Sequence, residues 1–175
     1  LDCVHCSSTV GTDCSGEVKT CDFDQTHCQT TTSEIIQDGR ASHRVFKFCA
    51  EAETENSIHR EELLATFLQM EVQICNTDNC NKGPGKITPR DNRPNGVKCK
   101  QCYVEHSANC DSEKASKCTG DMNKCLFISG FVCDDDVCAQ RVCTNMASPE
   151  QYPFYYEVIA GNIHKLEVTE GISDV

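Results

Sequence analysis

The pattern of apolar and polar side chains along the chain favours β-structure. Residues 29–36 and 42–49 are two β-rich runs that flank Asp38-Gly39. Asp-Gly between such runs is a strong hairpin signal, because glycine tolerates the positive φ that a tight hairpin turn needs. A further strand is predicted for residues 125–133. The pattern therefore predicts an all-β chain in which hairpins are the main local unit.

One stretch departs from this pattern. Between residues 57 and 68 the apolar side chains recur at helical spacing, which predicts a short helix. The run that follows, residues 68–75, alternates strictly and predicts a half-buried strand. The helix would carry Leu63, Leu64, Phe67 and Leu68, and the apolar side of the strand would carry Met70, Val72 and Ile74.

The cysteines add a longer period to the chain. Five cysteines recur about 96 positions later with almost the same intervals, 3, 8, 7 and 7 in the first set and 3, 8, 8 and 7 in the second. Such an internal repeat indicates two copies of one module. Residues 83–95 are rich in glycine, proline and charge, which is typical of a linker. We therefore expect domains over residues 1–82 and 96–175.

Composition places the chain among disulfide-stabilised proteins. It has 16 cysteines in 175 residues and no tryptophan, so each half can bury only a modest core and needs cross-links. This usage indicates an oxidising compartment, and the chain starts at Leu1 without an apolar leader, as expected of a mature secreted protein. No run approaches the roughly 20 apolar residues that span a bilayer.

The formal charge of −11 disfavours binding to nucleic acid and to anionic membranes, because both attract lysine and arginine side chains. It permits a basic protein as the partner. The alternative is that the acidity serves only to keep a secreted protein soluble.

Two cysteine pairs raise the question of metal or redox chemistry. Cys3-x-x-Cys6 and Cys99-x-x-Cys102 have the spacing of zinc ligands or redox pairs. Each belongs to a repeated, even set of eight cysteines in a chain with the composition of a secreted protein. We therefore expect disulfides at these positions, and neither a metal nor another cofactor.

Histidines give no clear sign of catalysis. His59 lies close to Glu61 and Glu62, but no nucleophile, phosphate-binding loop or metal partner accompanies it. A polar helix face is the simpler interpretation, and we expect the chain not to be an enzyme.

Two groups are candidates for contacts with a partner. Asp134, Asp135 and Asp136 lie between Cys133 and Cys138, where a local bridge would hold an acidic loop at the tip of a finger. Tyr155 and Tyr156 belong to the densest aromatic cluster, and aromatic residues dominate interface hot spots. The alternatives are a charged loop that resists aggregation and aromatic packing in the second core.

The cysteine pattern also resembles a known family. Cys3-x-x-Cys6, the cysteines that follow and the terminal Cys80-Asn81 resemble a three-finger domain of the urokinase-receptor and lymphocyte-antigen superfamily. Two such domains in tandem resemble the gamma-class phospholipase A2 inhibitors of reptile serum and the sodefrin-precursor-like factors of amphibians. The fold implied is a small disulfide-rich all-β protein of two tandem three-finger domains.

The resemblance implies a disulfide pairing that spacing alone cannot give, because eight cysteines allow 105 pairings. The chain departs from the family in two places: Ile74 stands where a cysteine is usual, and the second module lacks the closing loop. We pair the two remaining cysteines of that module with each other. The expected bridges are Cys3–Cys28, Cys6–Cys14, Cys21–Cys49, Cys75–Cys80, Cys99–Cys125, Cys102–Cys110, Cys118–Cys143 and Cys133–Cys138.

Three functions follow as expectations from the resemblance. The first is a secreted, non-enzymatic module that inhibits a secreted phospholipase A2 or a similar basic protein by binding it. The second is a protein pheromone that acts on a chemosensory receptor. The third is a structural or host-defence component of a secretion.

Overall fold

The computed structural model describes residues 1–133, 136–152 and 161–173. The chain divides into two compact units. The first contains Leu1–Ile58 and Leu68–Pro89, and the second contains His59–Phe67 and Arg90–Val175. The division falls within two successive strands, β5 (Ser57–Leu63) and β6 (Thr66–Cys75). The boundaries expected from the sequence stay a prediction.

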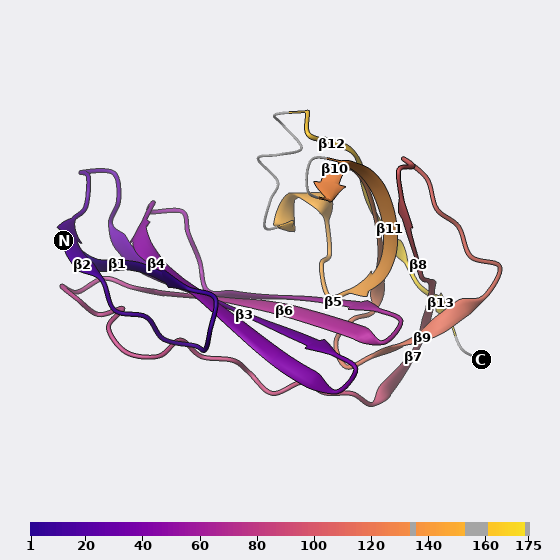
Figure 1. Ribbon diagram of the computed structural model, residues 1–175, viewed down its shortest axis with the longest axis horizontal. Coiled ribbons are helices and arrows are strands. Elements are labelled where there is room, and N and C mark those ends of the chain that lie inside the picture. The colour runs from indigo at the N-terminus through magenta and orange to yellow at the C-terminus, as the bar shows by residue number, and fades with distance from the viewer. Residues whose placement is uncertain (134–135, 153–160, 174–175) are drawn as a thin grey trace. The chain divides into compact units, whose positions relative to one another are not determined.

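The first unit is built on one long hairpin. Strands β3 (His27–Gln37) and β4 (Arg40–Ala50) pair antiparallel along their whole length (Figure 1). At the turn Asp38 has φ 51° and Gly39 has φ 75°, which confirms the predicted hairpin. Strand β1 (Asp2–Ser8) pairs with β4 and with the short β2 (Glu17–Thr20).

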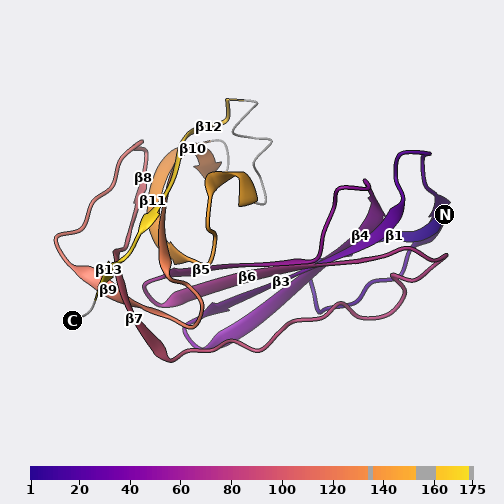
Figure 2. The ribbon, with the colours of Figure 1, turned by 180° about the vertical axis from the view of Figure 1, so that it is seen from behind.

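The second unit is organised around β10 (Lys124–Cys133). This strand lies between β11 (Asp136–Thr144) and β12 (Ile163–Glu170), and both pairings are antiparallel (Figures 1 and 2). Its apolar cluster contains Leu126 and Val142. The remaining elements are β7 (Pro94–Lys100), β8 (Cys102–Glu105), β9 (Ala115–Thr119), a 3-10 turn over Pro149–Gln151 and β13 (Ile172–Ser173).

The prediction of a helix over residues 57–68 is wrong. The segment is extended in β5 and β6, which meet at a turn where Leu64 has φ 53°. Leu63 packs against the apolar cluster of the second unit, whereas Leu64 is exposed. Pairing of β5 with β11, at Cys143↔Glu62, supplies long-range hydrogen bonds that outweigh a weak local helical preference. None of the helical segments in the described residues is long and apolar enough to cross a membrane.

Four disulfides lie within each of the two units. In each unit two of them lie side by side, because Cys21 Sγ is 3.2 Å from Cys3 Sγ and Cys118 Sγ is 3.4 Å from Cys99 Sγ. Sulfur in a disulfide carries no thiolate with which to bind a metal. The bridges are Cys3–Cys28, Cys6–Cys14, Cys21–Cys49, Cys75–Cys80, Cys99–Cys125, Cys102–Cys110, Cys118–Cys143 and Cys133–Cys138.

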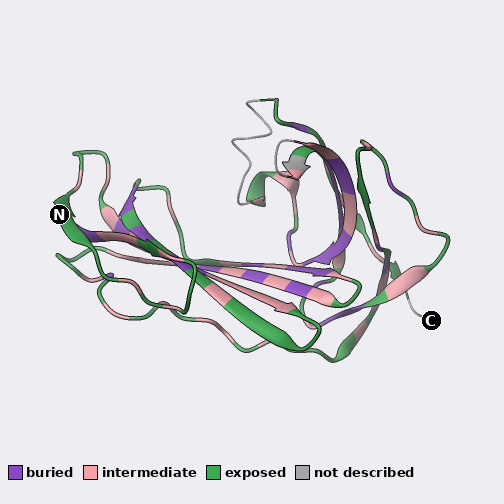
Figure 3. Cartoon of the chain, viewed as in Figure 1, coloured by how far each residue is buried: buried purple, intermediate pink, exposed green. Residues whose placement is uncertain are grey.

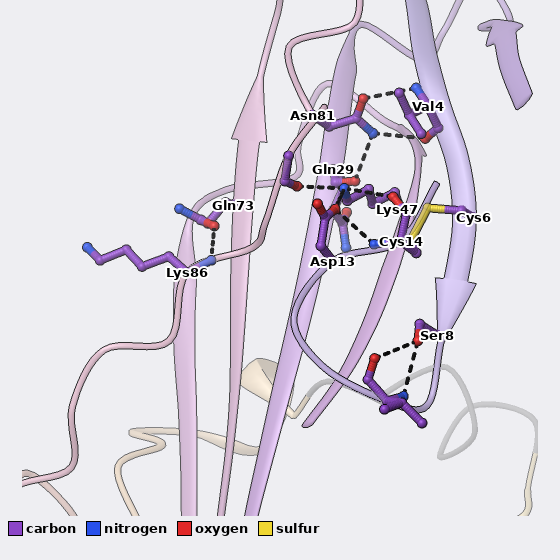
Figure 4. A network of polar contacts seen from close by, with 12 residues as sticks. Val4, Cys6, Ser8, Asp13, Cys14, Gln29, Lys47, Gln73, Asn81 and Lys86 are labelled. Atoms are coloured by element: carbon purple, nitrogen blue, oxygen red, sulfur yellow. Dashed lines mark hydrogen bonds and ion pairs between the residues drawn. A yellow bond between two sulfur atoms is a disulfide. The ribbon is translucent and has the colours of Figure 1, made fainter. Parts of the chain in front are cut away.

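A buried lysine joins three parts of the first unit. The Lys47 side chain on β4 has no solvent exposure, and its ammonium group donates to Asp13 Oδ1 at 2.5 Å, to the Gly83 carbonyl at 2.6 Å and to the Cys14 carbonyl at 3.3 Å (Figure 4). These three acceptors match the three donors of an ammonium group. The loop that contains Asp13 and Cys14 and the segment after Asn81 are therefore both tied to β4.

Strand β6 buries its polar side. Buried and half-buried residues alternate along most of it (Figure 3), and its buried side chains are Phe67, Gln69 and Glu71. Gln69 donates to the Thr88 carbonyl at 2.9 Å, and Glu71 accepts from the Thr88 amide at 2.7 Å. The expected strand is confirmed, but Met70, Val72 and Ile74 are only half-buried, because the chain before Pro89 covers the polar side. Gly85 fits there because a Cβ would lie 1.9 Å from Thr32 Oγ1.

Residues His59–Phe67 are anchored in the second unit by a buried carboxylate. Glu62 accepts from Thr119 Oγ1 at 2.6 Å and from the Arg90 guanidinium at 3.1 Å. The same guanidinium lies 4.4 Å over the ring of Phe67, which is almost fully buried. The tip of the β5–β6 hairpin is thus held by an ion pair, a hydrogen bond from Thr119 and the stacking of the Arg90 guanidinium on Phe67.

A peptide map of the unreduced protein checks the covalent frame. We expect eight intramolecular bridges with the pairing given above and no free thiol signal. A peptide that joins Cys133 to Cys118 would contradict the arrangement of the second unit.

The Asp13–Lys47 pair predicts an acid-sensitive contribution to stability. The hydrogen bond from Lys47 lowers the pKa of Asp13 below 3.8, so this contribution is present above that pH and is lost as the pH falls through the lowered value. Asp13→Asn should lower the urea midpoint at pH 7 and make the loss on acidification smaller than in the parent protein. Asp38→Asn at the exposed hairpin turn is the control and should change neither. Equal pH profiles for the parent and Asp13→Asn would contradict the assignment.

Removal of the Glu62 carboxylate should destabilise the second unit. Glu62→Ala removes the carboxylate that Arg90 and Thr119 share, and the loss in free energy of unfolding should be about 2 kcal/mol or more. Glu113→Ala removes an exposed carboxylate and should change the free energy by less than about 0.5 kcal/mol. Urea unfolding of both variants measures the difference, and equal stabilities would show that Glu62 does not anchor the hairpin.

Candidate protein-binding surface

Strand β4 exposes two aromatic side chains in the first unit. Burial alternates along it, so Val45, Lys47 and Cys49 point inward while Phe46 and Phe48 remain 49% and 37% exposed. The register places Thr31 opposite Phe46 and Gln29 opposite Phe48 on β3. Exposed aromatic rings beside small polar side chains suit contact with another protein.

Two loops at the base of this hairpin are brought together by a disulfide. Cys21–Cys49 holds the Cα atoms 5.7 Å apart, so residues 22–26 and 51–56 leave the sheet from neighbouring points. The first loop turns through a hydrogen bond from the Gln25 amide to the Asp22 carbonyl, and the second through one from the Thr54 amide to the Glu51 carbonyl. Both loops are therefore ordered locally by their own backbone.

The two loops combine an exposed aromatic ring with negative charge. Phe23 is 97% exposed and is flanked in sequence by Asp22 and Asp24. Within the part of the chain that the structure describes, none of the five acidic side chains pairs with a lysine or arginine. We call this surface the acidic base loops; it consists of Asp22, Phe23, Asp24, Glu51, Glu53 and Glu55.

The acidic base loops have the properties of a protein-binding surface. Unpaired carboxylates attract positive charge and speed up encounter, while a protruding ring can fill a pocket on the partner. Among the residues that the structure describes these carboxylates form no ion pair, so a cationic group would compensate them without breaking one. The chemistry that this arrangement supports is recognition.

The candidate residues named from the sequence lie elsewhere. Asp134, Asp135, Tyr155 and Tyr156 are outside the described residues. Asp136 is the first residue of β11 in the second unit, and its carboxylate contacts Nδ1 of the His106 ring. The role of these residues in binding stays a prediction.

Sequence reasoning missed the acidic base loops. An Asp-Phe-Asp run directly after Cys21 was the available signal, because an aromatic residue between two acids beside a half-cystine is poorly placed for a core. The glutamates at 51, 53 and 55 alternate just before the stretch that was expected to be a helix. Their relation to Phe23 depends on the Cys21–Cys49 bridge, which joins segments 28 residues apart.

Comparisons with known proteins match the cysteine frame. The family model of the u-PAR/Ly-6 domain matches residues 1–83. Phospholipase A2 inhibitor NAI of Notechis ater is 30% identical over 137 residues, which cover 74% of this chain and 66% of that protein. The phospholipase A2 inhibitor 25 kDa subunit of Naja kaouthia is 26% identical over 133 residues, which cover 74% of this chain and 71% of that protein.

The crystal structure of mouse TEX101 aligns with 99% of this chain and 99% of that one, at 16% sequence identity and a TM-score of 0.40, a likeness too distant to add to the assignment. The family model covers the first 83 residues, and the similarity to the sequence relatives covers about three quarters of the chain. Residues 1–83 thus match the u-PAR/Ly-6 domain, and over about three quarters of its length the chain is similar in sequence to the phospholipase A2 inhibitors.

Proposed function

We propose that this chain is an extracellular, non-enzymatic protein that binds a basic protein through the acidic base loops. The observation that carries the proposal is Phe23, a fully protruding ring amid carboxylates that have no cationic partner in the described chain. Burial of such a ring would gain about 2 kcal/mol or more of apolar transfer energy. The surrounding charges would select a cationic partner.

The partner that we propose is a secreted phospholipase A2 with a basic surface. Relatives at 26–30% identity bear the name phospholipase A2 inhibitor, and the similarity covers 66–71% of their length. The proposed mechanism is steric: the inhibitor occupies a surface of the enzyme and blocks the approach of its substrate. No residue of the inhibitor takes part in a chemical step.

The two parts of the surface have different roles in this proposal. Asp22, Asp24 and the glutamates of the second loop act at a distance and set the rate of association. Phe23 acts after contact and slows dissociation, because a desolvated aromatic anchor must be withdrawn from its pocket. Salt should therefore affect association more than dissociation.

Binding of a basic secreted phospholipase A2, followed by surface plasmon resonance, tests the proposal. Phe23→Ala should weaken binding by about tenfold or more, mainly through faster dissociation. Asp24→Asn/Glu53→Gln should slow association and reduce its dependence on salt between about 50 and 300 mM, since exposed charges are screened over about 10 Å at 0.1 M.

Matched controls separate these effects from general changes in the protein. Val10→Ala removes another exposed apolar side chain of the first unit, and Glu113→Gln/Glu150→Gln removes two exposed carboxylates elsewhere. Both should bind like the parent. Binding that is indifferent to salt and to Phe23→Ala would refute the assignment to this surface, and a stoichiometric complex that leaves the enzyme active would refute inhibition.

A further inference from the structure

The second unit contains a pocket that the proposed function does not use. Its volume is about 170 Å³, and it opens on the face of the sheet formed by β10, β11 and β12. Strands β7 and β13 contribute to its walls. Its lining includes Lys100, Phe127, Arg141, Glu167, Glu170 and Ile172.

The sheet register builds the centre of this pocket. Phe127 on β10 lies opposite Arg141 on β11 and opposite Glu167 on β12, so the three side chains form one row across the sheet. The guanidinium carbon of Arg141 lies 4.2 Å from the ring centroid of Phe127, and its Nε donates to the Cys110 carbonyl at 2.8 Å. Arg141 is thus held by stacking and by one hydrogen bond.

The charged groups around Arg141 already have partners. Glu167 pairs with Lys165 at 3.2 Å, and Glu170 pairs with Lys124. Lys100 pairs with Asp111 at 3.2 Å. In the described portion of the chain Arg141 has no carboxylate within ion-pair distance, although its charge helps to lower the pKa of Asp111, so its two terminal nitrogens have no carboxylate partner at the pocket.

The rest of the pocket is suited to an apolar group. Phe127 is 5% exposed beneath Arg141, whereas Ile172 is 54% exposed at the rim. The Cys99–Cys125 disulfide adds an apolar surface. A dry cavity of about 150 Å³ accommodates a molecule of the size of benzene, so this pocket can take a ligand of about six to nine heavy atoms.

We propose that this pocket binds a small aliphatic carboxylate. The carboxylate accepts from the two terminal nitrogens of Arg141, which the bond to Cys110 leaves free, and the hydrocarbon part packs against Phe127 and Ile172. The same chemistry is offered by a free short-chain acid and by the carboxyl terminus of a peptide that ends in an aliphatic residue. The site lies in the second unit and does not depend on the acidic base loops of the first.

Titration of the unmodified protein with hexanoate, hexanamide and hexylamine, followed by ¹⁵N chemical shifts, tests the proposal. Hexanoate should bind at least about tenfold more tightly than either analogue, because a charge-assisted bidentate pair is roughly twice as strong as a neutral hydrogen bond. The shifts should centre on Phe127, Arg141 and Ile172. Equal affinity of hexanoate and hexylamine, or shifts centred elsewhere, would overturn the proposal even without a mutant.

Two substitutions test the role of Arg141. Arg141→Gln should reduce hexanoate affinity to that of hexanamide, and Arg141→Lys should retain part of it. Arg44→Gln in the first unit is the control.

The length of the ligand tests the apolar part of the pocket. From butanoate to octanoate, the affinity should rise about fourfold per added carbon until the pocket is full. A pair of peptides, Gly-Gly-Val as free acid and as amide, distinguishes the peptide source: tighter binding of the peptide acid than of any free acid assigns the site to a peptide terminus. Unchanged hexanoate binding by folded Arg141→Gln would exclude Arg141 as the anion contact.

Discussion

The structure depends above all on the pairs of neighbouring disulfides from which the fingers extend. In the first unit the buried apolar cluster consists of half-cystines, Cys3, Cys28 and Cys49, and further half-cystines pack around it. Hydrophobic burial in so small a core contributes little, and cross-links compensate by restricting the unfolded chain, each by about 2–4 kcal/mol. Because covalent bonds fix where the strands begin, the fold depends less on apolar side chains at the inward positions of those strands.

This weaker requirement for apolar side chains allows the first unit to have a polar interior. Lys47, Gln69 and Glu71 occupy inward positions that an ordinary small β-protein would fill with aliphatic side chains. Each finds hydrogen-bond partners in the segment that precedes Pro89, so the cost of burial is offset. This segment, which is rich in glycine and proline, thus acts as one wall of the domain while it leads to the second unit.

Local sequence signals predicted the local structure well, and long-range contacts explain the rest. Asp38-Gly39 specifies its hairpin by itself, and strict alternation specifies β6. The helix was wrongly predicted because Leu63, Leu64, Phe67 and Leu68 have helical spacing, whereas Leu63 packs against a cluster that contains Val142 of β11, about 80 residues later. The burial of Gln69 could not be predicted because its partner, Thr88, lies in a stretch with the composition of a linker. The binding surface around Phe23 was not predicted, because it depends on which loops a disulfide brings together.

The anchoring of His59–Phe67 by Glu62 and Arg90 bears on where the chain can be divided. A stretch that lies between two segments of the first unit in the sequence supplies a strand neighbour to β11 in the second unit. A fragment that ends near residue 90 would keep this stretch and lose its partner, and a fragment that begins there would lose the neighbour of β11. The boundary between the two compact units is therefore not a single point in the sequence.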